Sequence, residues 1–230
     1  MKLKETLSNL QVNENRMKAE NIGDEHVGTS FETPLRPDAF ERDDELKIEL
    51  IEKHFREIMT ILGLDLEDDS LSGTPYRVAK MYVKEIFSGL NPANKPDIKL
   101  FENKYNYNEM LVEKDIHFHS FCEHHFLPIV GKAHVAYISN GQVVGLSKIN
   151  RIVHHFARRP QVQERMTVQI ANELKAALGT EDVAVLIDAA HLCVSARGVE
   201  DQGSSTVTSN YSGKFANEET RTEFLKYVKG

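Results

Sequence analysis

The chain contains two cysteines, Cys122 and Cys193, and each lies two positions from a histidine. The first belongs to Cys122-Glu123-His124-His125, and the second ends His191-Leu192-Cys193. Thiolates and imidazoles are ligands that zinc favours, so the two clusters predict a metal site with further histidines beside it. A fold that builds this site must bring two distant segments of the chain together.

Composition narrows the class of protein. Of the 230 residues, 40% are hydrophobic and 27% are charged, which is typical of a soluble globular protein. No apolar run approaches the roughly 20 residues that span a bilayer, and the N-terminus lacks the apolar stretch of a secretory signal. Two cysteines cannot form a disulfide framework, so we expect a cytoplasmic protein. The net charge of −7 disfavours nonspecific nucleic-acid binding.

The first half of the chain divides into two regions. Residues 1–43 are polar and predict a mobile arm, with a short helix at its start. Residues 44–109 form a helical region. Its first helix has apolar residues at helical spacing from Ile48 to Leu62 and stops at Gly63. Its second helix starts with Thr74 as N-cap and Pro75 at the first position, and ends at Gly89.

Residues 110–230 predict strands, two helices and further strands, in that order. Strands are expected over residues 111–121, 129–138, 183–187, 192–195 and 204–211, with a hairpin-type turn at Asn140-Gly141. One helix would be capped by Ser147, and the next would start at Pro160 and end at Gly179. This order predicts an α+β fold in which helices cover one face of an antiparallel sheet.

Cys122, His125 and Cys193 can supply the three protein ligands of a catalytic zinc site. Two alternatives remain open. The cysteines can be buried small hydrophobic residues, or the site can be a structural zinc with His124 or His191 as fourth ligand. As spare imidazoles near a metal, His124 and His191 suit proton transfer, although either can instead be a supporting or core histidine. The remaining histidines of this half are expected on the surface or in the sheet: His117, His119, His134, His154 and His155.

A second candidate site lies around the start of the 147–156 helix. Ser147, Lys148 and Arg151 would place a hydroxyl and two cations where helix amides attract phosphate. Arg197 follows Cys193 by four residues and can join that pocket, whereas Arg158 and Arg159 are interpreted as a solvated basic face.

Gln163-Glu164 near the next helix start gives a third candidate. A carboxylate there can accept paired hydrogen bonds from a guanine edge, but a helix-dipole partner or a salt bridge is the simpler interpretation from the residues alone.

Several separated motifs together resemble the GTP cyclohydrolase I family. They are Cys122-Glu123-His124-His125, the segment 145–151 (GLSKINR), the segment 159–165 (RPQVQER), and His191-Leu192-Cys193 with the Ala-Arg-Gly that follows. The segment 74–81 (TPYRVAKM) resembles the family's N-terminal helix motif. The resemblance runs from about residue 45 to the C-terminus and does not cover the arm.

The resemblance implies a tunnelling fold in residues 110–230, a homodecamer with active sites between subunits, and conversion of GTP and water to 7,8-dihydroneopterin triphosphate and formate. It implies Zn²⁺ on Cys122, His125 and Cys193, proton transfer by His124 and His191, and guanine binding by Glu164 with Gln163. Triphosphate would be bound by Ser147, Lys148, Arg151 and Arg197, with Lys80 reaching the phosphates of a neighbouring subunit's site. Ser195 and Gly73 depart from residues found in some members, lysine and aspartate respectively.

Two other functions remain to be separated from this one. A related tunnelling-fold enzyme acting on another purine or pterin would be expected to lack either the zinc triad or the triphosphate cluster. A zinc-stabilised structural or regulatory module would bind metal without catalysis.

Overall fold

The computed structural model describes residues 30–229, and residues 32–230 form one compact unit. Most of the arm predicted for residues 1–43, including its short helix, lies outside the described residues. No helix within residues 30–229 has the length and apolar character needed to cross a membrane.

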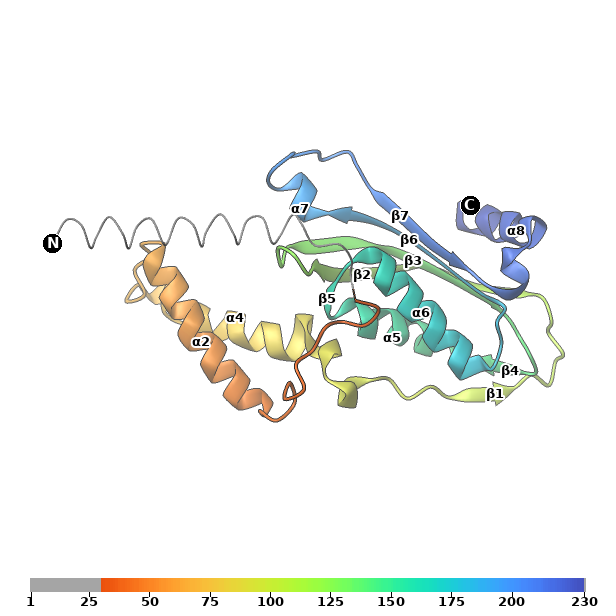
Figure 1. Cartoon of the computed structure of the whole chain (residues 1–230), viewed down its shortest axis with the longest axis horizontal. Helices are drawn as coiled ribbons and strands as arrows, with labels where there is room; N and C mark the ends of the chain where they lie inside the picture. Colours follow the sequence, from red (N-terminus) through yellow and green to blue (C-terminus); the bar gives the residue numbers. More distant parts are fainter. Residues whose placement is uncertain (1–29, 230) are drawn as a thin grey trace. The chain divides into compact units, whose positions relative to one another are not determined.

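The N-terminal region is helical, and its two longer helices pack against each other (Figure 1). A π-helix and two 3-10 turns continue it toward the sheet. The elements are α2 (Asp44–Ile61), α3 (Asp69–Ser72), α4 (Thr74–Met81), η1 (Tyr82–Ile86), η2 (Ser88–Leu90) and η3 (Pro92–Asn94). Asp43 caps α2 by accepting from the Leu46 amide, and Gly63, with φ of 84°, lies just beyond its end.

Five strands form the main sheet in the order β5-β2-β3-β6-β7. All neighbouring pairs are antiparallel except the short β2–β5 pair. The strands are β2 (Met110–Cys122), β3 (Pro128–Ile138), β5 (Pro160–Gln161), β6 (Val183–His191) and β7 (Thr206–Tyr211). A separate two-stranded sheet pairs β1 (Leu100–Glu102) with β4 (Gln142–Val144).

The two faces of the sheet have different coverings. α5 (Leu146–Ala157) and α6 (Gln163–Leu178) lie side by side against one face, which holds the main hydrophobic core (Figure 1). Along β3, Val135 and Tyr137 point into this core, whereas Ala136 points to the opposite face. There η4 (Gly213–Ala216) and α8 (Glu218–Lys229) cover one end with two buried phenylalanines. The chain therefore has the α+β architecture expected from its sequence.

Three local predictions are wrong. Pro160 does not start a helix. It lies in β5, where it pairs with Phe121 of β2, and α6 begins three residues later. Residues 192–195 form the single turn α7 (Leu192–Ser195) rather than a strand. The Asn140-Gly141 turn leads into β4, which pairs with β1 instead of folding back on β3. In each case contacts with distant parts of the chain override the local sequence preference.

Both predicted side-chain caps are also absent. Thr74 is the first residue of α4, and its hydroxyl accepts a hydrogen bond from Arg77 Nη2 at 2.9 Å. Gly145 occupies the cap position of α5, two residues before Ser147, which lies inside the helix.

Candidate metal centre and active site

Three predicted ligands converge at one end of the sheet. β2 ends at Cys122, His125 lies in the β2–β3 loop, and Cys193 lies in α7 directly after β6. One donor atom from each lies within 4.8 Å of the others. The pairing of Ile129 in β3 with His191 in β6 brings the two distant segments together. Cys122 is buried, Cys193 half-buried and His125 exposed, so the group opens to solvent on one side.

The β2–β3 loop is closed by its own backbone. The Phe126 amide donates to the Cys122 carbonyl at 2.8 Å, and the Cys122 amide donates to the Leu127 carbonyl at 2.9 Å. Phe126 has φ of 53°, a left-handed conformation that costs energy for a residue with a side chain. This tight turn holds both histidines of the loop beside the Cys122 sulfur.

The donor set fits a zinc ion. Two thiols and one imidazole are typical ligands, and three protein ligands leave a coordination position for substrate or water. Burial raises the pKa of the Cys193 thiol, and the nearby Cys122 sulfur raises it further. A cation is therefore the group that would stabilise both sulfurs as thiolates.

Two more histidines lie beside this cluster. His124 Nδ1 lies 3.7 Å from the Cys122 sulfur, and its side chain is 42% exposed. His191 Nε2 donates to the side-chain oxygen of Gln163 at 2.8 Å. Burial lowers the pKa of His191, and the charge of Glu164 partly opposes that effect. The structure thus places two imidazoles where they can exchange protons with a molecule bound at the cluster.

Arg197 and Glu164 lie at the same end of the sheet. Arg197 Nη1 lies 3.2 Å from His125 Nε2, so its guanidinium borders the candidate metal site. Glu164 is exposed in the first turn of α6, next to the buried Gln163. A cation and a carboxylate therefore flank the cluster.

The other predicted phosphate ligands are not part of this group in a single chain. Ser147, Lys148 and Arg151 occupy the start of α5, directly after β4. There the Val144 amide donates to the Tyr137 hydroxyl, near the end of β3 remote from the metal cluster. The eight residue-to-residue steps from Ile129 to Tyr137 rise about 26 Å along a strand.

Lys80 belongs to an element that carries none of the three candidate metal ligands. It is exposed on α4 and is not among the three residues whose donor atoms lie within 4.8 Å of one another. The predicted site is thus divided into parts that lie on different regions of one subunit.

Two basic residues differ from their predicted setting. Arg159 is not solvated: its side chain is 14% exposed, and Nε donates to the Gly89 carbonyl at 2.8 Å. His155 is neither on the surface nor in the sheet. It is buried in α5, with Nε2 at 2.7 Å from Arg159 Nη2, and burial together with the nearby Arg159 lowers its pKa to about 4. Both residues help to join α5 to η2.

Sequence reasoning also missed a buried ion pair below the site. Arg165 bonds to Glu123, and its Nε donates to the Gln161 side-chain oxygen at 3.0 Å. The second carboxylate oxygen of Glu123 lies 3.8 Å from His124 Nε2. The only available signal was the position of Glu123 between a cysteine and a histidine.

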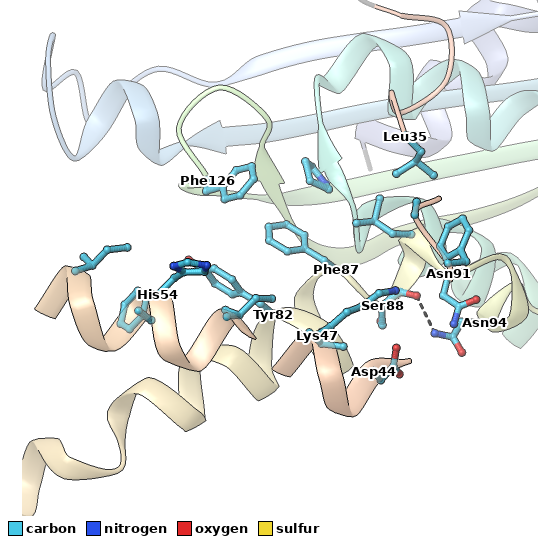
Figure 2. Close-up of a pocket in the computed structure, with 18 residues that line it drawn as sticks. Leu35, Asp44, Lys47, His54, Tyr82, Phe87, Ser88, Asn91, Asn94 and Phe126 are labelled. Atoms are coloured by element: carbon cyan, nitrogen blue, oxygen red, sulfur yellow. Dashed lines mark hydrogen bonds between the residues drawn. The ribbon is translucent and has the colours of Figure 1, made fainter. Parts of the chain in front are cut away.

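An aromatic cavity adjoins the outer side of the β2–β3 loop (Figure 2). Its volume is about 480 Å³, and its lining includes residues of α2, η1 and the loop. The Phe87 ring centroid lies 5.2 Å from that of Phe126 and 5.7 Å from that of Phe121. These rings support the loop that carries His124 and His125.

Comparison with known proteins agrees with this geometry. Residues 51–229 match the family described as GTP cyclohydrolase I. A "GTP cyclohydrolase 1" of Flavobacterium johnsoniae is 61% identical over 208 residues, which cover 90% of this chain and 93% of the relative. Proteins of the same description from Citrobacter koseri and Escherichia coli O1:K1 are 55% and 56% identical, covering 88% of this chain and 92% of each relative. The chain therefore belongs to the GTP cyclohydrolase I family.

Proposed function

We propose that this chain catalyses the zinc-dependent conversion of GTP and water to 7,8-dihydroneopterin triphosphate and formate. The observation that carries the proposal is the convergence of Cys122, His125 and Cys193 donor atoms within 4.8 Å. This group occurs in a chain that is 61% identical to a GTP cyclohydrolase 1. When bound, zinc supplies a Lewis acid that makes water nucleophilic near neutral pH.

The chain's own residues would supply acid and base groups for the reaction. Opening of the imidazole ring requires protonation at N7 and attack of water at C8, and C8 leaves as formate. His191 would protonate N7, and His124 would move protons during ring opening, sugar rearrangement and closure of the new ring. Burial lowers the pKa of His191, which favours its neutral form.

Substrate binding is assigned to residues with complementary charge. Glu164, exposed beside His191, would accept hydrogen bonds from the N1–H and amino group of guanine. Arg197 lies beside His125 of its own subunit's metal cluster, and there it would bind phosphate oxygens of the substrate. Ser147, Lys148 and Arg151 would bind the triphosphate, with Lys80 as a further cation.

The division of these residues supports an oligomer in which subunits share active sites. In one chain the start of α5 lies near the end of β3 opposite the metal cluster. β7 pairs only with β6 within residues 30–229, so its other edge can pair with a strand of another copy. We propose a homodecamer, and a measurement of mass in solution tests its size. The predicted cytoplasmic location and the division into 1–43, 44–109 and 110–230 remain proposals.

The direct test is to incubate zinc-loaded protein with GTP. We expect formate and, after oxidation, a fluorescent pterin in equal amounts. ATP is the matched control because it lacks the N1–H and amino group that Glu164 would bind. Absence of both products from GTP would reject the enzymatic function and favour a zinc-stabilised structural module. Equal turnover of ATP would reject the assignment of the purine substrate.

A further inference from the structure

The side-chain amide of Gln163 is held in one orientation at the start of α6. Gln163 is 1% exposed. Its Nε2 atom donates to the Thr206 carbonyl at 2.8 Å, and lies 3.1 Å from the Thr208 hydroxyl and 3.2 Å from the Ile187 carbonyl. Backbone carbonyls only accept hydrogen bonds, so the nitrogen must face β6 and β7.

The opposite side of the amide then determines how His191 is bonded. Gln163 Oε1 can only accept, and it lies 2.8 Å from His191 Nε2. His191 must therefore carry a hydrogen on Nε2 for this bond to form. The imidazolium and one neutral tautomer both satisfy that condition, and they differ only at Nδ1.

The helix start is itself anchored, so the amide cannot easily turn. Thr167 Oγ1 lies 2.8 Å from the Gln163 carbonyl and donates to it, and its oxygen lies 2.7 Å from the Thr208 hydroxyl. Gln163 is thereby tied to α6 by its backbone and to β7 by its side chain. This double attachment keeps Oε1 directed at His191.

We propose that Gln163 is a positioning residue that orients the His191 ring and keeps its Nε2 protonated, so that Nδ1 is the nitrogen that exchanges protons. The inference rests on the proposed function. It replaces the expected role of Gln163 as a substrate ligand, because the nitrogen of its buried amide is occupied by β6 and β7 and its oxygen by His191. Glu164, the next residue, remains the exposed group for the guanine.

Kinetics can separate positioning from substrate binding. Gln163→Met removes the acceptor for His191 while keeping a side chain of similar length. We expect kcat for GTP to fall about 10- to 100-fold in the zinc-loaded enzyme, with KM changed by less than about threefold. Gln163→Glu keeps an acceptor and should recover part of the lost kcat. Gln169→Met is the matched control, because it also removes a buried amide from α6, but one bonded to Gln161 and Glu32.

The outcomes have distinct meanings. A rise in KM with kcat unchanged would show a substrate ligand and overturn the proposal. The proposal would also be overturned if Gln169→Met lowered kcat as much as Gln163→Met. Absence of turnover in the unmodified enzyme would instead reject the proposed function.

A second measurement does not depend on turnover or on the stability of a variant. Long-range nitrogen–proton NMR correlations on ¹⁵N-histidine-labelled, zinc-loaded protein distinguish the two neutral tautomers. His191→Asn identifies the signal. We expect neutral His191 to carry its proton on Nε2. A proton on Nδ1 of the neutral ring would overturn the inference, whatever the activity.

Discussion

The sulfur of Cys193 belongs to the candidate metal centre, while His191, two residues earlier, is bonded to Gln163. We therefore predict separable effects of substitution. Cys193→Ser should remove both zinc and turnover, because a serine hydroxyl is a poor zinc ligand. His191→Ala should keep zinc and lose turnover. Zinc content and formate release measure the two effects. Full zinc occupancy in Cys193→Ser would refute the ligand set, and near-normal turnover in His191→Ala would refute its acid–base role.

His155 gives a prediction about stability and pH. Its pKa is lowered to about 4 from an ordinary value of 6.5, mainly by burial and then by the charges of Arg159 and Lys95. Between these two values the unfolded chain binds more protons than the folded chain. The contribution of His155 to the free energy of unfolding is thus complete above pH 6.5 and falls as the pH drops toward 4. The loss between pH 7 and 5 is about 2 kcal/mol.

Urea unfolding of the zinc-loaded protein at pH 7 and 5 measures this loss. His155→Gln should show a smaller pH dependence, because a glutamine can accept from Arg159 but cannot become charged. His54→Gln is the control, since His54 is exposed on α2. An unchanged pH dependence in His155→Gln would contradict the buried neutral imidazole.

Sequence alone predicted which thiols and imidazole come together better than it predicted the surroundings of individual cations. Cys122, His125 and Cys193 could be named because thiols are few and the chemistry of zinc restricts its partners. The burial of Arg159 could not be predicted, because it depends on the Gly89 carbonyl and the His155 ring. Gly89 is distant in the sequence, and the orientation of His155 is known only from the packed structure. The same sequence pattern on an exposed helix end would be solvated.

At the scale of elements, the segment between α4 and η2 supports the loop that carries His124 and His125. Phe87 contacts Phe126 at the tip of this loop and Phe121 near the end of β2. Phe87→Ala should lower the free energy of unfolding by about 3 kcal/mol through lost ring packing. It should also weaken zinc binding, because a looser loop holds His125 less firmly.

Urea unfolding and a zinc titration measure these effects. Phe101→Ala is the matched control, because Phe101 lies in β1 and is 57% exposed. We expect little change in either quantity for the control. Equal zinc affinity in the unmodified protein and Phe87→Ala would contradict the supporting role of the aromatic ring.

The elements that could be predicted from the sequence are those with a strong local pattern. Segments rich in Val, Ile, Phe and Tyr indicated β2 and β3, and helical spacing followed by a glycine indicated α6 and its end at Gly179. β5 could not be predicted, because its two residues are a strand only through pairing with Phe121 and Cys122. The turn α7 is equally nonlocal in origin, since it follows the strand that ends beside β3.

At the scale of the whole molecule, the separation of the proposed substrate-binding residues leads to a prediction about subunits. Within one chain, the metal cluster and the start of α5 lie near opposite ends of β3. If sites are shared, one subunit provides Cys193 while another provides Lys148. Cys193→Ser and Lys148→Ala should each be inactive or nearly so as pure proteins. Co-expression of the two should restore activity, because some sites then receive both unmodified parts.

The extent of recovery gives a quantitative check. Random assembly from equal amounts leaves about one quarter of the sites with neither substitution when two subunits contribute to each site. We therefore expect about a quarter of the activity of the unmodified enzyme. Co-expression of Cys193→Ser with Cys122→Ser is the control, because both changes affect the same part and no combination repairs it. Mixed oligomers without recovered activity would contradict the shared site, since a site built within one chain cannot be repaired by a neighbour.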